Sequence, residues 1–236
     1  MQSQGAGGTV RRIWRYPVKS LCGEEMDHIE VDRRGLARDR QLAIYNPDGK
    51  IASGKETRRF CRIPGLLMAS ARTQGQDVIL HRGQESVAVS DPQVHERISN
   101  WFGQPLTLAK ETQISHFDEL PVSLLTTAAL DQVAGWLDQG PVEPSRFRAN
   151  VLIDAPGDGC IEDDWVGHRL VFASGLRLEV VSRITRCVMI TMRSVTAPPD
   201  LRVLSVLADR HDACLGVVAR VVQTGAIEVG AQIQLD

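Results

Sequence analysis

Lysine is scarce in this sequence, and acidic and basic charges almost balance. Only four of the 27 basic residues are lysines, and the formal net charge is −2 over 236 residues. A chain with so little net charge has no global field to attract nucleic acid or an anionic membrane, and its basic residues are interspersed with acidic ones. We therefore expect neither nucleic acid nor membrane among its partners.

Long apolar runs, leader patterns and paired cysteines are also missing. No stretch approaches eighteen uninterrupted apolar residues, and MQSQGAGGTV has no charged segment followed by an apolar one. An odd number of widely spaced cysteines without a CxxC pair argues against a disulfide framework or a closed zinc site. These cysteines are Cys22, Cys61, Cys160, Cys187 and Cys214. The absences predict a soluble cytoplasmic protein, with 43% hydrophobic residues to build one large or two small domains.

The common catalytic motifs do not occur either. The sequence has no GxSxG, GxxxxGK[ST], HExxH or GxGxxG pattern, and its six histidines are scattered without metal-ligand spacing. Chemistry must therefore come from another arrangement of residues.

Short alternating or apolar runs dominate and predict a mainly β fold with a few helices, a β-rich α+β class. Up to about residue 90 these runs, with the turn NPDGK between two of them, indicate a small antiparallel sheet or barrel. Further short strands at regular intervals indicate a second barrel-like sheet. We expect a β-barrel-like domain over 1–90, a connecting helix and strand over 91–110, and a second β-barrel domain over 111–236.

Two helices are expected between the strands. DPQVHERISNWFG places Val94, Ile98 and Phe102 about one helical turn apart, after an Asp–Pro start and before Gly103 as a stop. The second helix is expected over 127–137, where apolar residues recur on one face.

RITRCVMITM, residues 183–192, reads like a strand with an Arg–Cys pair in its middle. A neighbouring cation lowers the pKa of a thiol and favours the thiolate, which attacks electrophiles or binds a soft metal, whereas apolar burial has the opposite effect. Cys187 could equally be a small core residue, with Arg186 on the other face of the strand. The segment alone leaves both interpretations open.

Six short stretches follow one another along most of the chain: YPVKSLCGEEM (16–26), GLARDR (35–40), HFDELPVSLLTTAAL (116–130), SRFRANVLI (145–153), IEDDW (161–165) and ITRC (184–187). Together they resemble the MOSC superfamily. They are most similar to the group with an N-terminal β-barrel domain ahead of the MOSC domain, which includes the mitochondrial amidoxime-reducing component and its bacterial relatives. The resemblance implies that residues 1–90 are the N-terminal barrel domain and 111–236 the MOSC domain.

The resemblance also implies a molybdenum cofactor, Mo-molybdopterin, with the Cys187 thiolate as metal ligand and catalytic residue. Arg186 beside it would favour the thiolate and hold the anionic cofactor. Matching motif positions imply further cofactor-binding residues: Lys19, Ser20, Arg40, Arg148 and Asn150. Arginine can bind phosphate through two parallel hydrogen bonds, and lysine supplies a point charge. We expect the three cations of this set to converge on one pocket between the two sheets, because burying them together is costly without an anion.

Thr126 and Thr127 stand where the second helix would begin, and they offer a hydroxyl and free N–H groups to an anion. Each candidate also has an ordinary structural interpretation: a helix cap for Thr127, salt bridges for the arginines, a turn for Asn150. Glu162 and Asp163 could serve as acid–base groups, or their segment could form a turn that anchors a strand.

Several positions depart from the pattern of the related reductases. Those proteins usually carry Thr-Thr-Val-Asp-Pro after the Arg–Cys pair, whereas ITMRS (190–194) follows here. Lys55 stands where arginine is usual, Ala149 where proline is common, and Val218 where a pocket tyrosine is often found. These departures bear on substrate choice more than on cofactor binding. Asp118 of HFDELP is interpreted as a loop brace.

The expected function is a molybdenum-cofactor-dependent reductase of small N-hydroxylated or similarly N-oxygenated compounds. The alternatives are a carrier of molybdenum cofactor or of persulfide sulfur, like the C-terminal domain of molybdenum-cofactor sulfurases, and a barrel that has lost its cofactor. Pyridoxal phosphate binding is also associated with such domains. The chain has neither ferredoxin cysteine spacing nor a dinucleotide fingerprint, so we expect electrons from a separate electron-transfer protein.

Overall fold

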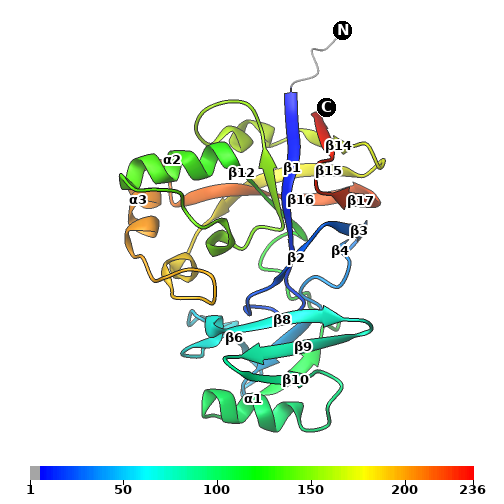
Figure 1. Cartoon of the computed structure of the whole chain (residues 1–236), viewed down its shortest axis with the longest axis vertical. Coiled ribbons are helices and arrows are strands. Elements are labelled where there is room, and N and C mark those ends of the chain that lie inside the picture. Colours follow the sequence, from blue (N-terminus) through cyan, green and yellow to red (C-terminus); the bar gives the residue numbers. More distant parts are fainter. Residues whose placement is uncertain (1–5) are drawn as a thin grey trace.

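The computed structural model describes residues 6–236, which form two strand-rich parts stacked along the long axis of the molecule (Figure 1). The helices in this range are α1 (Val94–Phe102), α2 (Thr127–Leu137) and α3 (Arg202–His211). The strands are β1 (Ala6–Arg15), β2 (Glu24–Met26), β3 (His28–Asp32), β4 (Gly35–Leu36), β5 (Leu42–Tyr45), β6 (Ile51–Ser53), β7 (Phe60–Arg62), β8 (Ala69–Gln74), β9 (Asp77–Arg82), β10 (Glu85–Ala88), β11 (Thr107–Lys110), β12 (Val122–Thr126), β13 (Val151–Asp154), β14 (Arg169–Phe172), β15 (Arg177–Thr185), β16 (Cys214–Gln223), β17 (Gly225–Glu228) and β18 (Gln232–Leu235). Short 3₁₀ turns span Leu66–Met68, Pro144–Phe147, Ile161–Trp165 and Val188–Thr191. The predicted mainly β class with a few helices is confirmed.

The larger part is a closed barrel. Its strands run in the order β13-β12-β16-β15-β14-β18-β1-β2, and β13 also pairs with β1, so that seven of them close on themselves. Because side chains alternate across each strand, every second residue points into the barrel. The interior is filled with aliphatic residues that include Val10, Ile13, Leu124, Val151, Ile153, Leu170, Leu178 and Val217. The helices α2 and α3 contact each other and lie on one side of the barrel (Figure 1).

The smaller part combines a four-stranded sheet, β11-β5-β6-β7, with a three-stranded sheet, β10-β9-β8, and the helix α1. Its core is separate from that of the barrel and includes Leu42, Ile44, Leu66, Leu80, Ile98 and Trp101. The predicted turn NPDGK joins β5 to β6, and the amide of Lys50 donates to Oδ1 of Asn46 at 2.9 Å. A third small sheet, β17-β3-β4, contributes Ile29, Val31 and Ile227 to the barrel core.

Both helices predicted from the sequence are confirmed. Gly103 ends α1 in the left-handed conformation at φ 67°, where a residue without a Cβ is favoured. The helix α2 spans 127–137 as predicted, and the Thr126 hydroxyl caps it by accepting a hydrogen bond from the amide of Ala129. The third helix, α3, was not among the predicted elements.

The prediction of a strand through RITRCVMITM is wrong beyond its first three residues. The pairing of β15 with β16 ends at Thr185, opposite Cys214. Arg186 and Cys187 follow the strand, and a 3₁₀ turn begins at Val188. The Arg–Cys pair therefore lies at the exit of a barrel strand.

The predicted division of the chain at residues 90 and 110 stays a prediction, but strand pairing cuts across it. The strand β1 comes from the predicted first domain, yet it pairs with β13 and β18 of the predicted last one. The first strand therefore helps to close the barrel.

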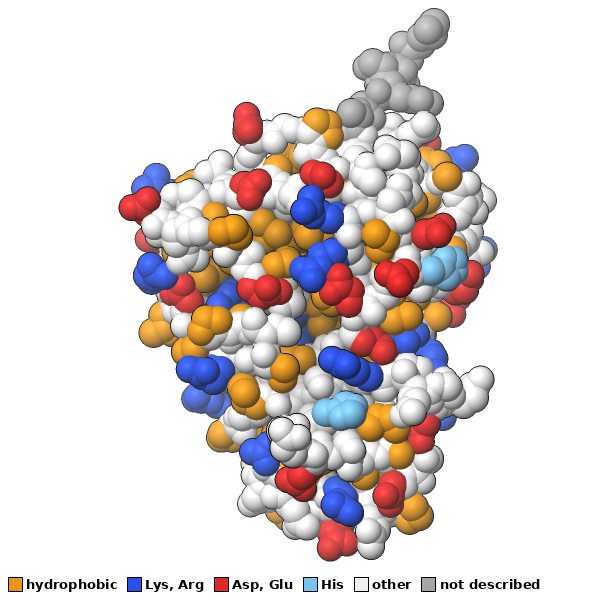
Figure 2. Space-filling model, in the orientation of Figure 1, with side chains coloured by type: hydrophobic (Ala, Val, Ile, Leu, Met, Phe, Trp, Pro, Cys, Tyr) orange, Lys and Arg blue, Asp and Glu red, His pale blue; other side chains and the backbone are white. Residues whose placement is uncertain are grey.

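On the face shown in Figure 2, acidic and basic side chains are interspersed, in agreement with the small net charge. Among the helices in residues 6–236, none is sufficiently long and apolar to span a bilayer.

Candidate functional site

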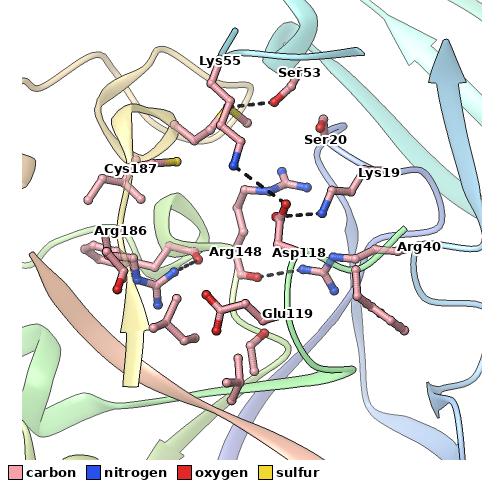
Figure 3. A pocket seen from close by; sticks show the side chains of 18 of the residues that line it. Lys19, Ser20, Arg40, Ser53, Lys55, Asp118, Glu119, Arg148, Arg186 and Cys187 are labelled. Atoms are coloured by element: carbon pink, nitrogen blue, oxygen red, sulfur yellow. Dashed lines mark hydrogen bonds and ion pairs between the residues drawn. The ribbon is translucent and has the colours of Figure 1, made fainter. Parts of the chain in front are cut away.

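A cavity of about 200 Å³ opens between the barrel and the smaller part. Its walls come from the ends of β6, β7, β12 and β15, from the middle of β16, and from the segments that follow β1 and β15 and precede β5, β12 and β13. Seven of the nine residues predicted to bind cofactor line it: Lys19, Ser20, Arg40, Arg148, Asn150, Arg186 and Cys187. Residues separated by up to 168 positions in the sequence thus meet at one place (Figure 3).

Cys187 is a free, half-buried thiol on the wall of this cavity. The backbone amide of the preceding residue, Arg186, donates to the carbonyl of Ala213 at 2.7 Å, which holds the chain at the strand exit. The Arg186 guanidinium donates to the carbonyls of Leu215 (2.8 Å) and Phe147 (2.7 Å). Burial lowers the pKa of Arg186 to about 10, so the group stays cationic at neutral pH beside the thiol.

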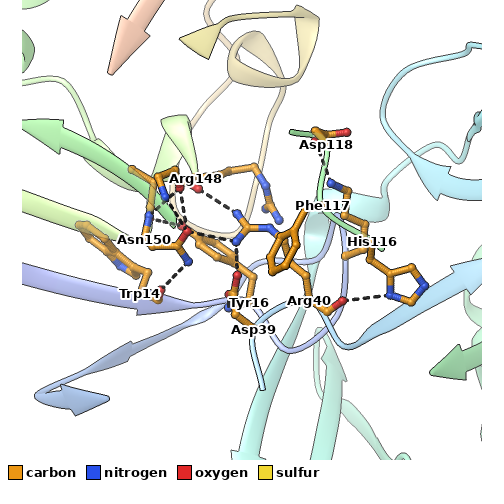
Figure 4. Close-up of polar contacts among 12 residues, drawn as sticks. Trp14, Tyr16, Asp39, Arg40, His116, Phe117, Asp118, Arg148 and Asn150 are labelled. Carbon is orange, nitrogen blue, oxygen red and sulfur yellow. Dashed lines mark hydrogen bonds and ion pairs between the residues drawn. The ribbon is translucent and has the colours of Figure 1, made fainter. Parts of the chain in front are cut away.

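Two guanidinium groups lie over the ring of Tyr16, with Arg40 at 4.7 Å and Arg148 at 4.6 Å from its centre (Figure 4). Arg40 is held by an ion pair to the fully buried Asp39 and by a 3.1 Å hydrogen bond to the carbonyl of Arg148. The Arg148 guanidinium has no hydrogen-bond or ion-pair partner among residues 6–236, and burial lowers its pKa. Arg148 is therefore the cation best placed to bind an incoming anion.

Lys19 is almost fully buried, and its ammonium contacts Oδ2 of Asp118 at 2.8 Å. Burial lowers the pKa of Lys19 to about 8, and the neighbouring Asp118 carboxylate opposes that shift. Lys55 approaches the same carboxylate at 3.8 Å (Figure 3). Its ammonium also lies over the ring of Phe60. One carboxylate thus stands between two lysines at the cavity wall.

Asn150 and Ser20 line the cavity but are also parts of its frame. Oδ1 of Asn150 accepts hydrogen bonds from the hydroxyl of Ser123 (2.8 Å) and from Arg40 (3.3 Å), and its Nδ2 donates to the carbonyl of Trp14 (3.2 Å). Most of its hydrogen-bonding capacity is used within the protein. Ser20 is buried, and its left-handed backbone (φ 68°) turns the chain between β1 and β2.

Thr126 and Thr127 do not line the cavity. The Thr126 hydroxyl caps α2 and donates to Oε2 of Glu162 at 2.6 Å, and the Thr127 hydroxyl donates to Asp154 at the surface. The start of α2 was predicted correctly, but the structure does not bring it to the other candidate residues.

The 3₁₀ turn after Cys187 packs on the loop that follows β6 in the smaller part. The sequence did not predict this contact. The thioether sulfur of Met189 accepts a hydrogen bond from the amide of Gly54 at 3.2 Å. A Cβ on Gly54 would lie only 2.6 Å from that sulfur and 2.5 Å from the sulfur of Met192. Ser53, Lys55 and Met189 also line the cavity. Of these residues, only Lys55 was singled out in the sequence, as a departure from the family pattern, and the departures at 190–194 lie directly after Met189.

Glu162 and Asp163 of IEDDW lie outside the cavity. Glu162 has no exposed surface, and burial raises the pKa of its carboxyl. Asp163 contacts His211 at 2.9 Å and Arg183 at 3.3 Å. An acid–base role in direct contact with substrate does not agree with these positions.

Two family models match this chain: the MOSC domain over residues 96–234, and the MOSC N-terminal beta barrel domain over residues 7–139. The chain belongs to the MOSC family. It is 25% identical to human mitochondrial amidoxime-reducing component 1, over 84% of this chain and 68% of that protein, and 22% identical to the mouse protein, over 82% and 68%. It is also 23% identical to the molybdenum cofactor sulfurase of Danio rerio over 83% of this chain, but spans only 30% of that protein.

The fold resembles that of the YUAD protein from Bacillus subtilis, with a TM-score of 0.54. The match covers 97% of this chain and 94% of that one at 14% identity, so it shows a shared fold and nothing further. The relatives support a function connected with molybdenum cofactor.

Proposed function

We propose that this MOSC protein is a molybdenum-cofactor-dependent reductase that removes oxygen from small N-hydroxylated compounds. The observation that carries the proposal is the free thiol of Cys187 in a cavity whose wall also contains Lys19, Arg40, Arg148 and Arg186. A thiolate is a soft ligand suited to a thiophilic metal, and the cations suit the phosphate of a molybdopterin. The amidoxime-reducing names of its relatives agree with this class of reaction.

The residues of the cavity fit such a cofactor. Arg148 presents a guanidinium without a protein partner, and Arg186 has a buried Nη2 without one among residues 6–236. Buried cations of this kind are costly unless an anion pairs with them. Cys187 would ligate the metal, and Arg148 and Lys19 would hold the phosphate, while Ser20 and Asn150 would shape the cavity wall around the cofactor.

When bound, the cofactor would supply a metal that accepts an oxygen atom and passes two electrons. The overall reaction consumes two electrons and two protons, breaks the N–O bond, and releases the reduced nitrogen compound and water. The protein side would orient the substrate between Cys187 and the wall formed by Lys55, Phe60 and Met189. We further propose that the electrons arrive from a separate electron-transfer protein, one or two at a time.

We expect the reaction in the cytoplasm. All five cysteines of the chain are free, which agrees with a reducing compartment. A cytoplasmic location would also give the protein access to small electron-transfer proteins.

The test uses protein produced in a host that synthesises molybdenum cofactor. Benzamidoxime is supplied with reduced methyl viologen, and benzamidine is measured; the donor is then replaced with NADH or NADPH alone. We expect product only with the artificial donor, and no product from Cys187→Ser. Cys160→Ser is the matched control, because Cys160 is half-buried and outside the cavity. Full turnover by Cys187→Ser, or turnover of wild type with nicotinamide alone, would contradict the proposal.

A carrier of molybdenum cofactor or of persulfide sulfur is the second candidate. It is favoured by the sulfurases among the relatives, such as the protein of Danio rerio, of which this chain spans only 30%. The same experiment separates the two candidates. Molybdenum-loaded protein that reduces no N-hydroxylated substrate with either donor would favour the carrier.

A further inference from the structure

His116 is a buried histidine that was not among the predicted site residues and does not line the cavity. It belongs to the loop between β11 and β12, which also carries Asp118, the carboxylate that pairs with Lys19. Only 1% of its surface is exposed, so both ring nitrogens need partners within the protein.

The contacts of the imidazole define where its proton lies. Nδ1 of His116 is 3.0 Å from the carbonyl oxygen of Arg40 (Figure 4), and Nε2 is 2.7 Å from the hydroxyl of Tyr45. A carbonyl oxygen can only accept, so Nδ1 carries a proton in this contact. Burial lowers the pKa of His116, so the ring is neutral at neutral pH and holds a single proton. Nε2 therefore accepts a hydrogen bond from the Tyr45 hydroxyl.

The turn that contains Arg40 is held by partners from other segments. Arg38 and Arg40 both have left-handed backbones, at φ 66° and 51°, which residues with a Cβ seldom adopt. The carbonyl of Asp39 accepts a 2.7 Å hydrogen bond from Nη1 of Arg34, and the next carbonyl accepts the one from His116. These two bonds hold the turn in a conformation that its own sequence does not favour.

The loop that carries His116 is anchored independently. The amide of His116 donates to Oε2 of Glu111 at 2.9 Å, and Nη2 of Arg34 donates to the same oxygen at 2.7 Å. The next carbonyl, that of Phe117, accepts a 3.0 Å hydrogen bond from Nη1 of Arg59. The imidazole therefore joins a fixed loop to the turn before β5.

Both ends of this connection lead to cations of the cavity. On one side, Nη2 of Arg40 donates to the carbonyl of Arg148 at 3.1 Å, and the Arg148 guanidinium is the cation without a partner in the described part of the chain. On the other side, Asp118 follows His116 by two residues and contacts the Lys19 ammonium at 2.8 Å. The imidazole thus connects two groups of cations that come from distant parts of the sequence.

We propose that His116 is a positioning residue for the anion-binding cations of the cavity. It sets the separation between Lys19 and the pair formed by Arg40 and Arg148. Its Nδ1–H holds the Arg40 carbonyl, while the Tyr45 hydroxyl holds the opposite nitrogen. A fixed separation suits an anion that several cations bind at once, because charge-assisted hydrogen bonds depend on geometry. That this anion is the phosphate of a molybdopterin rests on the proposed function, whereas the separation itself does not.

The first test locates the ring proton and needs no metal. Long-range proton–nitrogen correlation spectra of the isotope-labelled chain distinguish the two tautomers, and the His116 signals are assigned by their loss in His116→Gln. We expect the proton on Nδ1. His95 is the internal reference with the opposite tautomer, because its Nδ1 accepts a hydrogen bond from the amide of Leu108 at 3.0 Å. A proton on Nε2 of His116, or on both of its nitrogens, would overturn the assignment.

The second test compares His116→Asn with His116→Gln. The amide nitrogen of asparagine can occupy the place of Nδ1 and donate to the Arg40 carbonyl, whereas the longer glutamine reaches the place of Nε2 and faces Tyr45. Each variant keeps one hydrogen bond and loses the other, so we expect similar unfolding free energies in urea. Metal-free crystal structures should show the wild-type separation of Lys19 and Arg40 in His116→Asn and a changed one in His116→Gln. The same separation in both variants refutes the positioning role, whatever the function of the protein.

The third test measures bound molybdenum in both variants from a cofactor-producing host. We expect about tenfold less molybdenum per chain in His116→Gln, as when a group that orients a binding side chain is lost, and wild-type content in His116→Asn. A role in packing alone would lower both contents equally, so equal contents would contradict the effect on cofactor binding. Wild-type protein that acquires no molybdenum contradicts the proposed function instead, and the ring proton and the crystal structures then decide the role of His116.

Discussion

Arg148 and Arg40 lie over the same ring, that of Tyr16, but differ in what else holds them. Arg40 pairs with Asp39, which has no exposed surface, so Arg40→Ala leaves a buried carboxylate without its cation. We expect that variant to lose about 3 kcal/mol of unfolding free energy, as is usual when one partner of a buried pair is removed. Urea unfolding of the apoprotein measures the loss.

Arg148→Ala is the matched variant with the opposite expectation. The Arg148 guanidinium has no hydrogen-bond or ion-pair partner among residues 6–236, and its stacking on Tyr16 is worth about 1–2 kcal/mol. We expect apoprotein stability within that range of wild type, together with a clear loss of bound molybdenum. If Arg148→Ala retains all its cofactor, or unfolds as easily as Arg40→Ala, Arg148 is a structural residue.

Lys19 gives a pH dependence with a definite sign. Its pKa is lowered to about 8 in the folded chain, from 10.5, because the ammonium is buried. Between these values the unfolded chain binds more protons, so stability should rise with pH across this window and the cost of the buried charge should disappear. Relative to Lys19→Met, wild type should gain stability over this range. If the difference in unfolding free energy between the two proteins does not change with pH, the pKa of Lys19 is not lowered by burial.

Among the elements, the 3₁₀ turn after Cys187 and the loop after β6 depend on each other. A Cβ at Gly54 would lie 2.6 Å from the sulfur of Met189 and 2.5 Å from that of Met192. We expect Gly54→Ala to cost about 1–2 kcal/mol, as overpacking does, and to displace Met189 from the cavity wall. Calorimetry and the KM for benzamidoxime measure the two effects.

Gly135→Ala is the control for this prediction. Gly135 lies within α2, and a Cβ there would meet nothing within 4 Å. Alanine should therefore stabilise the helix by up to about 1 kcal/mol without changing KM. If Gly54→Ala behaves like this control, the two segments are not coupled through the methionine sulfurs.

Sequence patterns predicted elements well where the signal is local. The end signals and apolar spacing of α1 and α2 predicted their positions. The VLxxL spacing in α3, with Val203 and Leu207 buried, is a similar local signal. The apolar residues of RITRCVMITM favour a strand, so the sequence predicted one through the whole segment. The strand ends at Thr185 instead, and the Arg186 guanidinium donates to the carbonyls of Leu215 and Phe147 in two other segments. A guanidinium partner far along the chain leaves no trace in local periodicity.

At the scale of the whole molecule, the closure of the barrel and the convergence of the cavity residues depend on distant contacts. Thr9 pairs with Asp154, and no periodicity indicates that β1 completes the barrel. Lys19, Arg148 and Arg186 meet at one cavity, and only the family resemblance, not their spacing, made that prediction possible. Thr126 and Thr127 matched the same pattern but face other partners. A resemblance thus locates a site without resolving which matched residues reach it.

The most direct test of the central claim, that the Cys187 thiolate binds molybdenum, is X-ray absorption at the molybdenum edge. It is applied to wild type, Cys187→Ser and the control Cys160→Ser, all from a cofactor-producing host. The dithiolene contributes sulfur in every protein, so we expect one sulfur ligand fewer in Cys187→Ser and the wild-type number in Cys160→Ser. An identical sulfur count in all three proteins, or wild-type protein without molybdenum, would contradict the claim.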